Sequence, residues 1–214
     1  MEGTIMPLNL ADFNKKYRIS KVCGQEKQRH YLESLGFICG SEVELLSEIH
    51  GYYIVMVKGS KIGIVCCSNG LRPEQAETIK MLVQILEKSG LEVDLSPYLY
   101  GDENGQAGTA RERAGALMKF YEDDSVTDIF DVSGGDMANE ILSYLDFQTI
   151  AYEKKHFWGY SDLTTIINAI YARTGKSSVL YQIRNLTYDH SQSQITDFLS
   201  TTLAGATSLY DFPY

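Results

Sequence analysis

The chain has 214 residues, of which 44% are hydrophobic and 22% charged, and its formal net charge at pH 7 is -9. This composition is typical of a globular protein with one or two cores and argues against disorder or a fibrous structure. Because the charge is negative and no run is rich in Lys or Arg, a nucleic-acid partner is not expected.

The residue inventory also argues against secretion, a membrane span and a metal centre. The start, MEGTIMPLNLADFNKK, lacks the basic and apolar parts of a signal peptide, and no apolar segment is long enough to cross a bilayer, so we expect a cytoplasmic protein. No CxxC pair occurs, and no histidine stands at ligand spacing beside a cysteine. We therefore expect buried thiols at Cys23, Cys39, Cys66 and Cys67, scattered histidines at His30, His50, His156 and His190, and no metal or cofactor.

The first sixty residues are rich in short predicted strands. YRISKVC alternates like a strand, EKQRHYLESLG is a helix closed by Gly36, and EVELLSEI, YYIVMVK and SKIGI are further strands. This pattern predicts a small barrel with one inserted helix. Since no acid and base lie close together in the sequence, an adaptor is favoured over a catalytic domain.

Three segments of this region, in order and spacing, resemble the FeoA-type domain that accompanies bacterial ferrous-iron transporters: MPLNLADFNKKYRISKV, RHYLESLGFICGSEVELL and IVMVKGSKIGI. The shared marks are Leu-Gly-Phe after the helix, Gly-Ser before the next strand and the closing Val-Lys-Gly-Ser. The resemblance implies an SH3-like β-barrel over residues 1–62, a role in protein interaction, and a ferrous-iron transporter as a candidate partner.

From Lys61 onward, predicted strands alternate with helices. The strands are KIGIVCCS, LEVDLS, TDIFDVS, HFWGY and SSVLYQI, and the helices are RPEQAETIKMLVQILEKSG, RERAGALMKFYEDD with a capping box from Thr109 and Glu112, MANEILSYL, and the segment after Ser161. This order predicts right-handed crossovers and a mainly parallel sheet with flanking helices, an α/β fold whose sites lie at the carboxyl ends of the strands.

The two predicted domains compete for one segment. Lys61 to Ile64 would both close the barrel and open the sheet, and no Pro, Gly or Ser linker separates the domains. Because one strand cannot readily serve two cores, we expect the barrel to be the less regular of the two.

Ser161 is the strongest candidate for chemistry. In HFWGYSDLTTIINAIYART a short strand ends at Gly159 and Ser161, and a helix follows with apolar residues at helical spacing. A hydroxyl at a helix N-terminus lies beside unpaired amides and the positive end of the helix dipole, which would stabilise an oxyanion. The alternative is that Ser161 simply caps the helix, a position where serine is common.

A second candidate element is the pair Gly134 and Gly135, which follows the strand TDIFDVS. A Gly-Gly turn can bring backbone amides close to a ligand, or it can be a turn and nothing more. The rest of a GxGxxG motif and the lysine of a P-loop are lacking, so a nucleotide site is only weakly supported. Its predicted position at the same sheet edge as Ser161 favours a shared site.

The chain from about residue 61 to 214 resembles the N-terminal domain of the LD-carboxypeptidase family, which includes microcin-immunity peptidases. The similarity runs from KIGIVCCSNGL through TDIFDVSGGDM to FWGYSDLTTIINAIYARTG. It implies that Ser161 of the GYSD motif is the nucleophile and that the backbone amides of Asp162 and of Gly134 or Gly135 form the oxyanion hole. Many members have Arg and Tyr where this sequence has Ser133 and Asp136, which leaves the side-chain contacts to substrate open.

The general base that the resemblance implies has no counterpart in this sequence. In the family a histidine and its orienting glutamate come from a following domain, so we expect residues 63–214 to be the nucleophile domain with the C-terminal catalytic domain absent. His190 lies in a polar loop, and His156 starts the strand before Ser161. Since an unassisted serine is a weak nucleophile, we expect a poor hydrolase.

The last segment, ITDFLSTTLAGATSLYDFPY, predicts a helix ending near Gly205 and an aromatic tail that favours self-association through Tyr210, Phe212 and Tyr214. Taken together, the sequence predicts a serine-type LD-carboxypeptidase-like protein that cleaves the terminal D-amino acid from murein tetrapeptides through an acyl-enzyme, incomplete in this chain. The alternatives are a FeoA-like adaptor of ferrous iron transport, or a fragment with no independent function.

Overall fold

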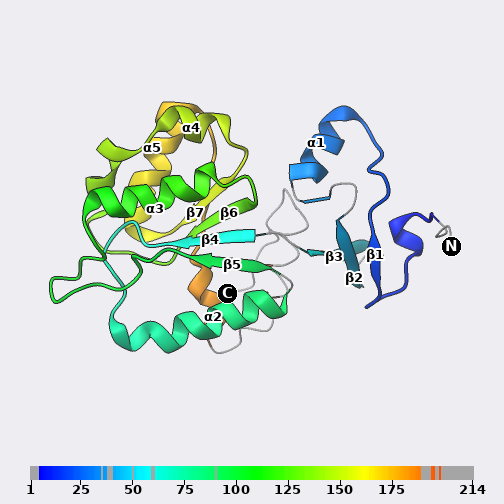
Figure 1. Cartoon of the computed structure of the whole chain (residues 1–214), viewed down its shortest axis with the longest axis horizontal. Helices are drawn as coiled ribbons and strands as arrows, with labels where there is room; N and C mark the ends of the chain where they lie inside the picture. Colours follow the sequence, from blue (N-terminus) through cyan, green and yellow to red (C-terminus); the bar gives the residue numbers. More distant parts are fainter. Residues whose placement is uncertain are drawn as a thin grey trace. The chain divides into compact units, whose positions relative to one another are not determined.

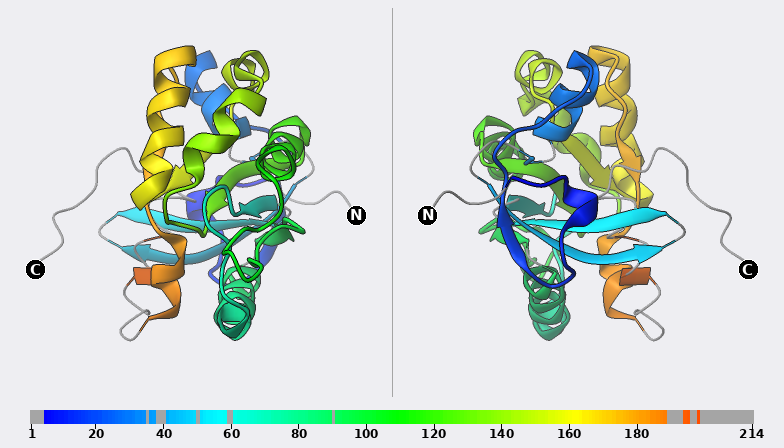
Figure 2. Two further views of the ribbon diagram at one scale, coloured as in Figure 1. Left: turned by 90° about the vertical axis from the view of Figure 1, so that its left-hand side faces the viewer. Right: turned by 90° about the vertical axis from the view of Figure 1, so that its right-hand side faces the viewer.

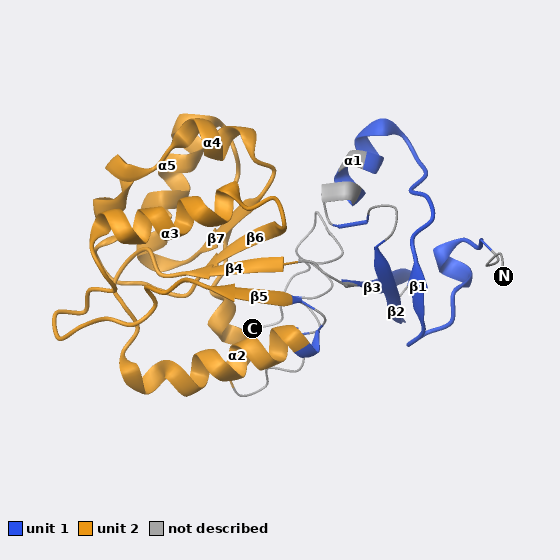
Figure 3. Cartoon of the chain, in the orientation of Figure 1, with its two compact units in different colours: residues 1–60, 88–91, 189–214 blue, residues 61–87, 92–188 orange. Residues whose placement is uncertain are grey.

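A computed structural model of the chain divides into two compact units, one with residues 1–60, 88–91 and 189–214 and the other with residues 61–87 and 92–188 (Figure 3). In the described part of the chain no helix is long and apolar enough to cross a membrane. The structure describes residues 5–34, 36–37, 41–49, 51–58, 61–89, 91–188, 194–195 and 198. The aromatic tail and most of the helix predicted before it therefore lie outside the described residues.

The first unit contains a three-stranded antiparallel sheet, order β1-β2-β3, with strands β1 (Lys16–Arg18), β2 (Glu42–Ile49) and β3 (Tyr52–Lys58). Helix α1 (Glu26–Ser34) lies between β1 and β2 in the sequence, and a short 3-10 helix, η1 (Leu8–Leu10), precedes them. Alternate strand residues point to the same face, so Val43 and Leu45 of β2 and Val57 of β3 lie on one buried face. Ile54, three residues before Val57 on β3, points to the other face and is buried as well. The alternating pattern thus places most, but not all, of the buried residues of β2 and β3 on one face.

The closed SH3-like barrel expected for this region is not confirmed, because the described residues form a small open antiparallel sheet. Of the first predicted strand, YRISKVC, only Tyr17 and Arg18 lie in a strand, β1, which begins at Lys16. The segment expected to close the barrel, β4 (Lys61–Val65), pairs instead in parallel with strands of the other unit. The competition for this segment is therefore resolved in favour of the larger sheet.

The second unit contains the predicted parallel sheet, with strand order β5-β4-β6-β7-β8 (Figure 1). Besides β4 its strands are β5 (Glu92–Leu95), β6 (Val126–Asp131), β7 (His156–Gly159) and β8 (Val179–Leu180). All four neighbouring pairs are parallel. The central strand β4 is apolar after Lys61 and buried from Ile62 to Val65, because helices cover both faces of the sheet.

The helices of this unit lie in two layers, with α2 (Ala76–Lys88) on one face of the sheet and α3 (Ala110–Glu122), α4 (Phe147–Tyr152) and α5 (Thr164–Thr174) on the other (Figures 1 and 2). The core beneath α3 and α5 is fully buried and includes Leu117, Phe120, Ile129, Phe157 and Ile166. The loop after β4 leads to α2 on one face, and the loop after β6 leads to the opposite face. The strand order therefore switches direction between β4 and β6, since β5 is added on one side of β4 and β6, β7 and β8 on the other. Ligands of open α/β sheets bind at such a point.

Two local predictions differ in outcome. The capping box is confirmed, since Thr109 Oγ1 accepts from the Glu112 amide at 3.3 Å and a Glu112 carboxylate oxygen accepts from the Thr109 amide at 2.8 Å. The helix predicted at MANEILSYL is instead a 3-10 helix, η3 (Ala138–Tyr144), and α4 was not predicted. The chain is extended at Leu145, where η3 ends, and the Asp146 carboxylate then caps α4.

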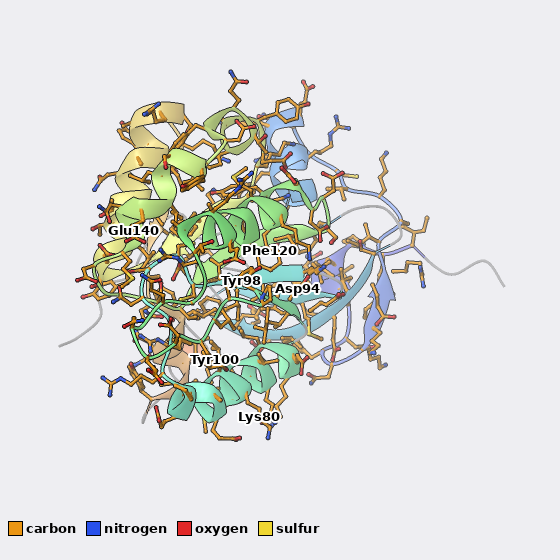
Figure 4. All side chains as sticks on the ribbon, turned by 60° about the vertical axis from the view of Figure 1, so that its left-hand side comes forward. Lys80, Asp94, Tyr98, Tyr100, Phe120 and Glu140 are labelled. Carbon is orange, nitrogen blue, oxygen red and sulfur yellow. The ribbon has the colours of Figure 1, made fainter. Side chains whose placement is uncertain are left out.

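Helix α3 packs very closely on β4 at Gly63. A Cβ atom at this glycine would lie 2.6 Å from ring carbons of Phe120, which is labelled in Figure 4. No side chain fits in that space, because carbon atoms in contact are normally separated by about 3.5–4.0 Å. Gly63 is therefore required for the distance between α3 and the central strand.

The first residue of β4 anchors the strand through ion pairs. Lys61 Nζ lies 3.1 Å from a carboxylate oxygen of Asp94 and 3.1 Å from one of Asp123. Hydrogen bonds from Ser125, together with Lys61, lower the pKa of Asp123 from 3.8 to about 2. A carboxyl whose pKa is lowered on folding stabilises the native state above its unfolded pKa and ceases to do so as the pH falls through its folded pKa.

We therefore expect Asp123→Asn to lower the free energy of unfolding by about 1 kcal/mol at pH 7, a value reduced for the partial exposure of the pair. The difference from the parent should shrink as the pH falls from about 4 to about 2. Urea unfolding across this range measures it, with the exposed neighbour Asp124→Asn as control. A difference between parent and Asp123→Asn that is independent of pH would contradict the assignment.

Candidate active site

Ser161 lies at the carboxyl end of β7, where the chain turns sharply into a helix. Tyr160 is extended, with φ -145° and ψ 162°, and Ser161 then has a φ of 60° in the left-handed region. It begins a short 3-10 helix, η4 (Ser161–Leu163), that leads into α5. A left-handed conformation costs a residue other than glycine on the order of 1–3 kcal/mol, and such strain is concentrated at functional sites.

The alternative in which Ser161 is only a helix cap is not supported. The cap residues are Tyr160 for η4 and Leu163 for α5, and neither makes a side-chain capping bond. The first turn is held instead by Thr164 Oγ1, which donates to the Ser161 carbonyl at 2.8 Å. The sharp turn thus presents Ser161 without using its hydroxyl as a cap.

The structure brings the Gly-Gly turn to Ser161. The two elements follow the neighbouring strands β6 and β7, whose carboxyl ends meet at one sheet edge. A Cβ atom built on Gly134 would lie 3.9 Å from Ser161 Oγ. The predicted proximity of Gly134 to Ser161 is therefore present.

Gly135 has a different reason to be glycine. Its φ is 134°, and an added Cβ would lie 2.0 Å from Asn69 Oδ1. Asn69 follows β4, pairs with Gly134 in an isolated antiparallel bridge, and accepts a hydrogen bond from the Asp136 amide at 2.9 Å. The glycine turn is thus packed against the loop after β4.

We expect Gly135→Ala to lower the free energy of unfolding by at least about 1–3 kcal/mol, because the variant adds both backbone strain and a clash with Asn69. Gly115→Ala is the matched control, since an added Cβ on this residue of α3 meets nothing within 4 Å. That control should raise stability by about 0.5–1 kcal/mol through helix propensity. Urea unfolding compares the two, and a Gly135→Ala chain as stable as the parent would refute the packing argument.

The Asp162 carboxylate ties three loops together. Asp162 Oδ2 accepts from Ser68 Oγ at 2.6 Å and from the Ala138 amide at 2.8 Å, and Ser68 Oγ also accepts from the Met137 amide at 3.3 Å. The loops after β4, β6 and β7 are therefore joined directly behind Ser161. Sequence analysis assigned Asp162 only a backbone role and missed this contact, since Ser68 lies 94 residues away.

A second buried network lies under the same loops. Asp131 accepts hydrogen bonds from the amides of Cys67 at 2.8 Å and Ser133 at 2.7 Å, and from Ser133 Oγ at 2.5 Å. Burial raises the pKa of Asp131, although these hydrogen bonds oppose the rise. Ser133 Oγ also accepts from the Ser68 amide at 3.0 Å, so the hydroxyl of Ser133 is engaged inside the protein.

Cys66 and Cys67, which follow β4, are buried thiols, as predicted. The same prediction is wrong for Cys23, which is exposed in the segment between β1 and α1, and Cys39 lies outside the described residues. Burial raises the pKa of Cys66 to about 12 and raises that of Cys67 well above its usual value. Because a thiol acts as a nucleophile only when it is ionised, neither competes with Ser161.

A buried arginine supports the loop after β4 from below. Arg113 on α3 donates to the carbonyl of Cys67 at 3.3 Å, to that of Ser68 at 2.8 Å, and to Glu140 Oε2 at 2.5 Å. Its side chain is 1% exposed, whereas Glu140, labelled in Figure 4, is 44% exposed. Arg113 is thus a buried cation whose partners include the backbone that carries Ser68.

Ser161 opens onto a pocket of about 510 Å³. This volume is within the range of ligand sites, which is about 300–1,000 Å³. Backbone and side chains from the ends of β6, β7 and β8 and from the following 3-10 helix surround it, and the lining residues are Ser133, Gly134, Tyr160, Ser161, Leu180, Tyr181, Gln182, Arg184, Asn185 and Tyr188.

The structure does not bring a histidine to Ser161 within the part of the chain that it describes. His156 lies at the opposite, amino end of β7, is 51% exposed, and has Nδ1 3.8 Å from Asp128 Oδ1. His190 lies outside the described residues. Among the described residues that line the pocket there is no His, Asp or Glu that could take a proton from Ser161.

The chain belongs to the LD-carboxypeptidase family: residues 62–181 match the description "LD-carboxypeptidase N-terminal domain", and residues 6–66 match the FeoA domain. The first match covers both Gly134–Gly135 and Ser161. The two matches overlap at residues 62–66, which the structure places in β4 and just after it.

Similar proteins carry related names. The chain is 32% identical over 118 residues to the probable murein peptide carboxypeptidase of Bacillus subtilis (strain 168), over 55% of this chain and 36% of the relative. It is 31% identical over 93 residues to the microcin C7 self-immunity protein MccF of Escherichia coli, over 44% of this chain and 27% of the relative.

The fold is shared with solved structures of MccF. The structure of MccF in complex with glutamyl sulfamoyl guanosine superposes with a TM-score of 0.63 at 24% identity, over 72% of this chain and 48% of that one. At this identity the likeness shows the fold alone. The chain spans about half or less of the length of the relatives that it matches.

Proposed function

We propose that residues 61–188 form the nucleophile-bearing part of a serine carboxypeptidase that removes the terminal D-amino acid from murein peptides. The observation that carries the proposal is the left-handed Ser161 at the end of β7, with Gly134 beside its hydroxyl and a pocket in front of it. A strained turn of this kind exposes a serine hydroxyl at the top of a parallel sheet in other serine hydrolases. The name of the Bacillus subtilis relative supports the substrate class.

In the proposed reaction Ser161 Oγ attacks the carbonyl carbon of the terminal peptide bond while its proton passes to a base. The oxyanion that forms is stabilised by the backbone amide of Asp162 and by that of Gly134 or Gly135. The C–N bond then breaks, the leaving nitrogen takes up a proton, and free D-alanine departs. Water hydrolyses the remaining ester on Ser161 and regenerates the hydroxyl.

The proposal places the general base outside the described residues. Without such a base the Ser161 hydroxyl is a weak nucleophile, because no His, Asp or Glu among the described residues that line the pocket can accept its proton. Catalysis by binding and oxyanion stabilisation alone can persist, at a rate several orders of magnitude below that of a complete site. Because the described residues that line the pocket supply no such acceptor, we infer that an added base would accelerate the reaction.

The experiment that tests this function is release of D-alanine from a murein tetrapeptide by the purified chain, with and without imidazole. Imidazole supplies the proton acceptor from solution, so release should be slow in its absence and rise with its concentration. N-Methylacetamide at the same concentrations controls for solvent effects. No release at any imidazole concentration would overturn the proposal.

For the first unit we propose a separate role, as an interaction module for a ferrous-iron transporter. The FeoA match supports it, together with exposed apolar side chains at Leu10 and Tyr52, which are 68% and 69% exposed. The test is binding of the full chain to a purified ferrous-iron transporter, measured beside a Leu10→Ser, Tyr52→Ser double variant. Equal binding by both chains, or none by the parent, would refute this role.

A further inference from the structure

The pocket in front of Ser161 contains a single charged side chain. Of its ten lining residues, which all belong to the described part of the chain, Arg184 alone carries a formal charge. The others are aromatic, apolar, amide or hydroxyl side chains and glycine. Arg184 therefore brings the one formal positive charge to the lining of the pocket that also contains Ser161, in a chain whose net charge is negative.

Arg184 is held in place through its backbone. It lies in a 3-10 helix, η5 (Ile183–Thr187), which follows β8. The Arg184 amide donates to Gln182 Oε1 at 3.3 Å, and the Arg184 carbonyl accepts from Thr187 Oγ1 at 2.8 Å. Gln182 in turn lies 3.5 Å from the carbonyl of Ser133, next to the glycine turn. The position of Arg184 is thus coupled to the Gly134 side of the pocket.

The guanidinium of Arg184 has an unmet donor. Its Nε atom is buried and makes no hydrogen bond to any residue that the structure describes. Arg113 also has an unpaired Nε, but its other guanidinium nitrogens bond to two carbonyls and to Glu140. A buried donor without a partner is costly, and a bound water, ion or ligand is one way to satisfy it.

We propose that Arg184 binds the terminal carboxylate of the peptide whose last bond lies at Ser161. A guanidinium matches a carboxylate in geometry and charge, with two parallel N–H donors for two oxygens. A carboxypeptidase substrate always carries this carboxylate next to the bond that is cleaved, whereas an internal peptide bond has none nearby. Arg184 would thereby select chain ends over internal bonds, an inference that rests on the proposed function for the location of the bond.

The test is peptide binding to the full chain carrying Ser161→Ala, so that no turnover interferes. A murein tetrapeptide ending in free D-alanine is compared by calorimetry with the same peptide ending in D-alanine amide. We expect the free acid to bind about 10- to 100-fold more tightly, and Arg184→Met to remove most of this preference while leaving the amide affinity nearly unchanged. Arg184→Lys should retain part of it, because the charge remains but the paired donors are lost.

Arg111→Met is the matched control, since Arg111 is exposed on α3 and does not line the pocket. Unfolding temperatures of all variants show whether each is folded. The inference would be overturned if Arg184→Met weakened binding of the free-acid peptide and of the amide peptide equally, or if the free-acid peptide showed no measurable binding. Since binding needs no turnover, an Arg184-dependent preference without D-alanine release would support this inference while the proposed function fails.

Discussion

Replacing Ser161 with alanine is expected to lower the imidazole-supported release of D-alanine by at least about 100-fold. The hydroxyl is the group that forms the acyl ester, and the residues around it cannot substitute for it. The neighbouring hydroxyl of Ser133 is bonded to Asp131 inside the protein, and the thiols of Cys66 and Cys67 are held in their neutral form by burial. Activity should therefore fall to the level of imidazole and peptide alone.

Ser143→Ala is the matched control for this variant, since Ser143 is exposed on η3 and does not line the pocket. It should release D-alanine at the parent rate at every imidazole concentration. Unchanged release by Ser161→Ala would mean that another group performs the attack, and would remove Ser161 from the site.

Arg113→Met is expected to lower the free energy of unfolding by about 2–4 kcal/mol. The methionine side chain leaves the buried carbonyls of Cys67 and Ser68 without their donor, and Glu140 loses its cation. Because the same loop carries Ser68 to the Asp162 carboxylate, the variant should also reduce D-alanine release. Urea unfolding with a constant denaturant slope measures the first effect.

Glu140→Gln distinguishes the ion pair of Arg113 with Glu140 from the hydrogen bonds of Arg113 to the carbonyls of Cys67 and Ser68. Glu140 is 44% exposed, so its charge can be solvated, and Arg113 keeps both carbonyls in this variant. We expect a loss below about 1 kcal/mol. A Glu140→Gln chain destabilised as much as Arg113→Met would mean that the ion pair, rather than the carbonyl bonds, holds the loop.

The larger unit was predictable because its signals are local and repeated. Apolar runs such as TDIFDVS are bounded by turn residues, and the capping pair Thr109 and Glu112 marks the start of α3. The order of strands and helices then requires a parallel sheet, and carboxyl-end turns bring Gly134 and Ser161 together. The periodicity of apolar residues in the strands and helices was therefore enough to predict that Ser161 and Gly134 lie at the same edge of the sheet.

The features that sequence analysis missed depend on contacts across the fold. The bond between Asp162 and Ser68 joins residues 94 positions apart, and no spacing rule indicates it. The helix predicted at MANEILSYL is the 3-10 helix η3, and α4, which Asp146 caps, lies beyond the predicted segment. The sequence predicted that Lys61 to Ile64 belongs to both the barrel and the sheet. In the structure this segment, β4, pairs with β5 and β6 and so belongs to the sheet. Arg184 carries no local motif at all.

The most direct measurement is the mass of the intact chain after reaction with an activated murein tripeptide. In this tripeptide a p-nitrophenyl ester replaces the bond that joins the third residue to D-alanine in the tetrapeptide. The activated leaving group needs little assistance from a base, so an acyl group should accumulate on the protein. We predict one acyl group per chain, located by peptide mapping on Ser161 and lost in Ser161→Ala but not in Ser143→Ala. Acylation at another residue, or equal acylation of the Ser161→Ala chain, would contradict the role of Ser161 as the nucleophile.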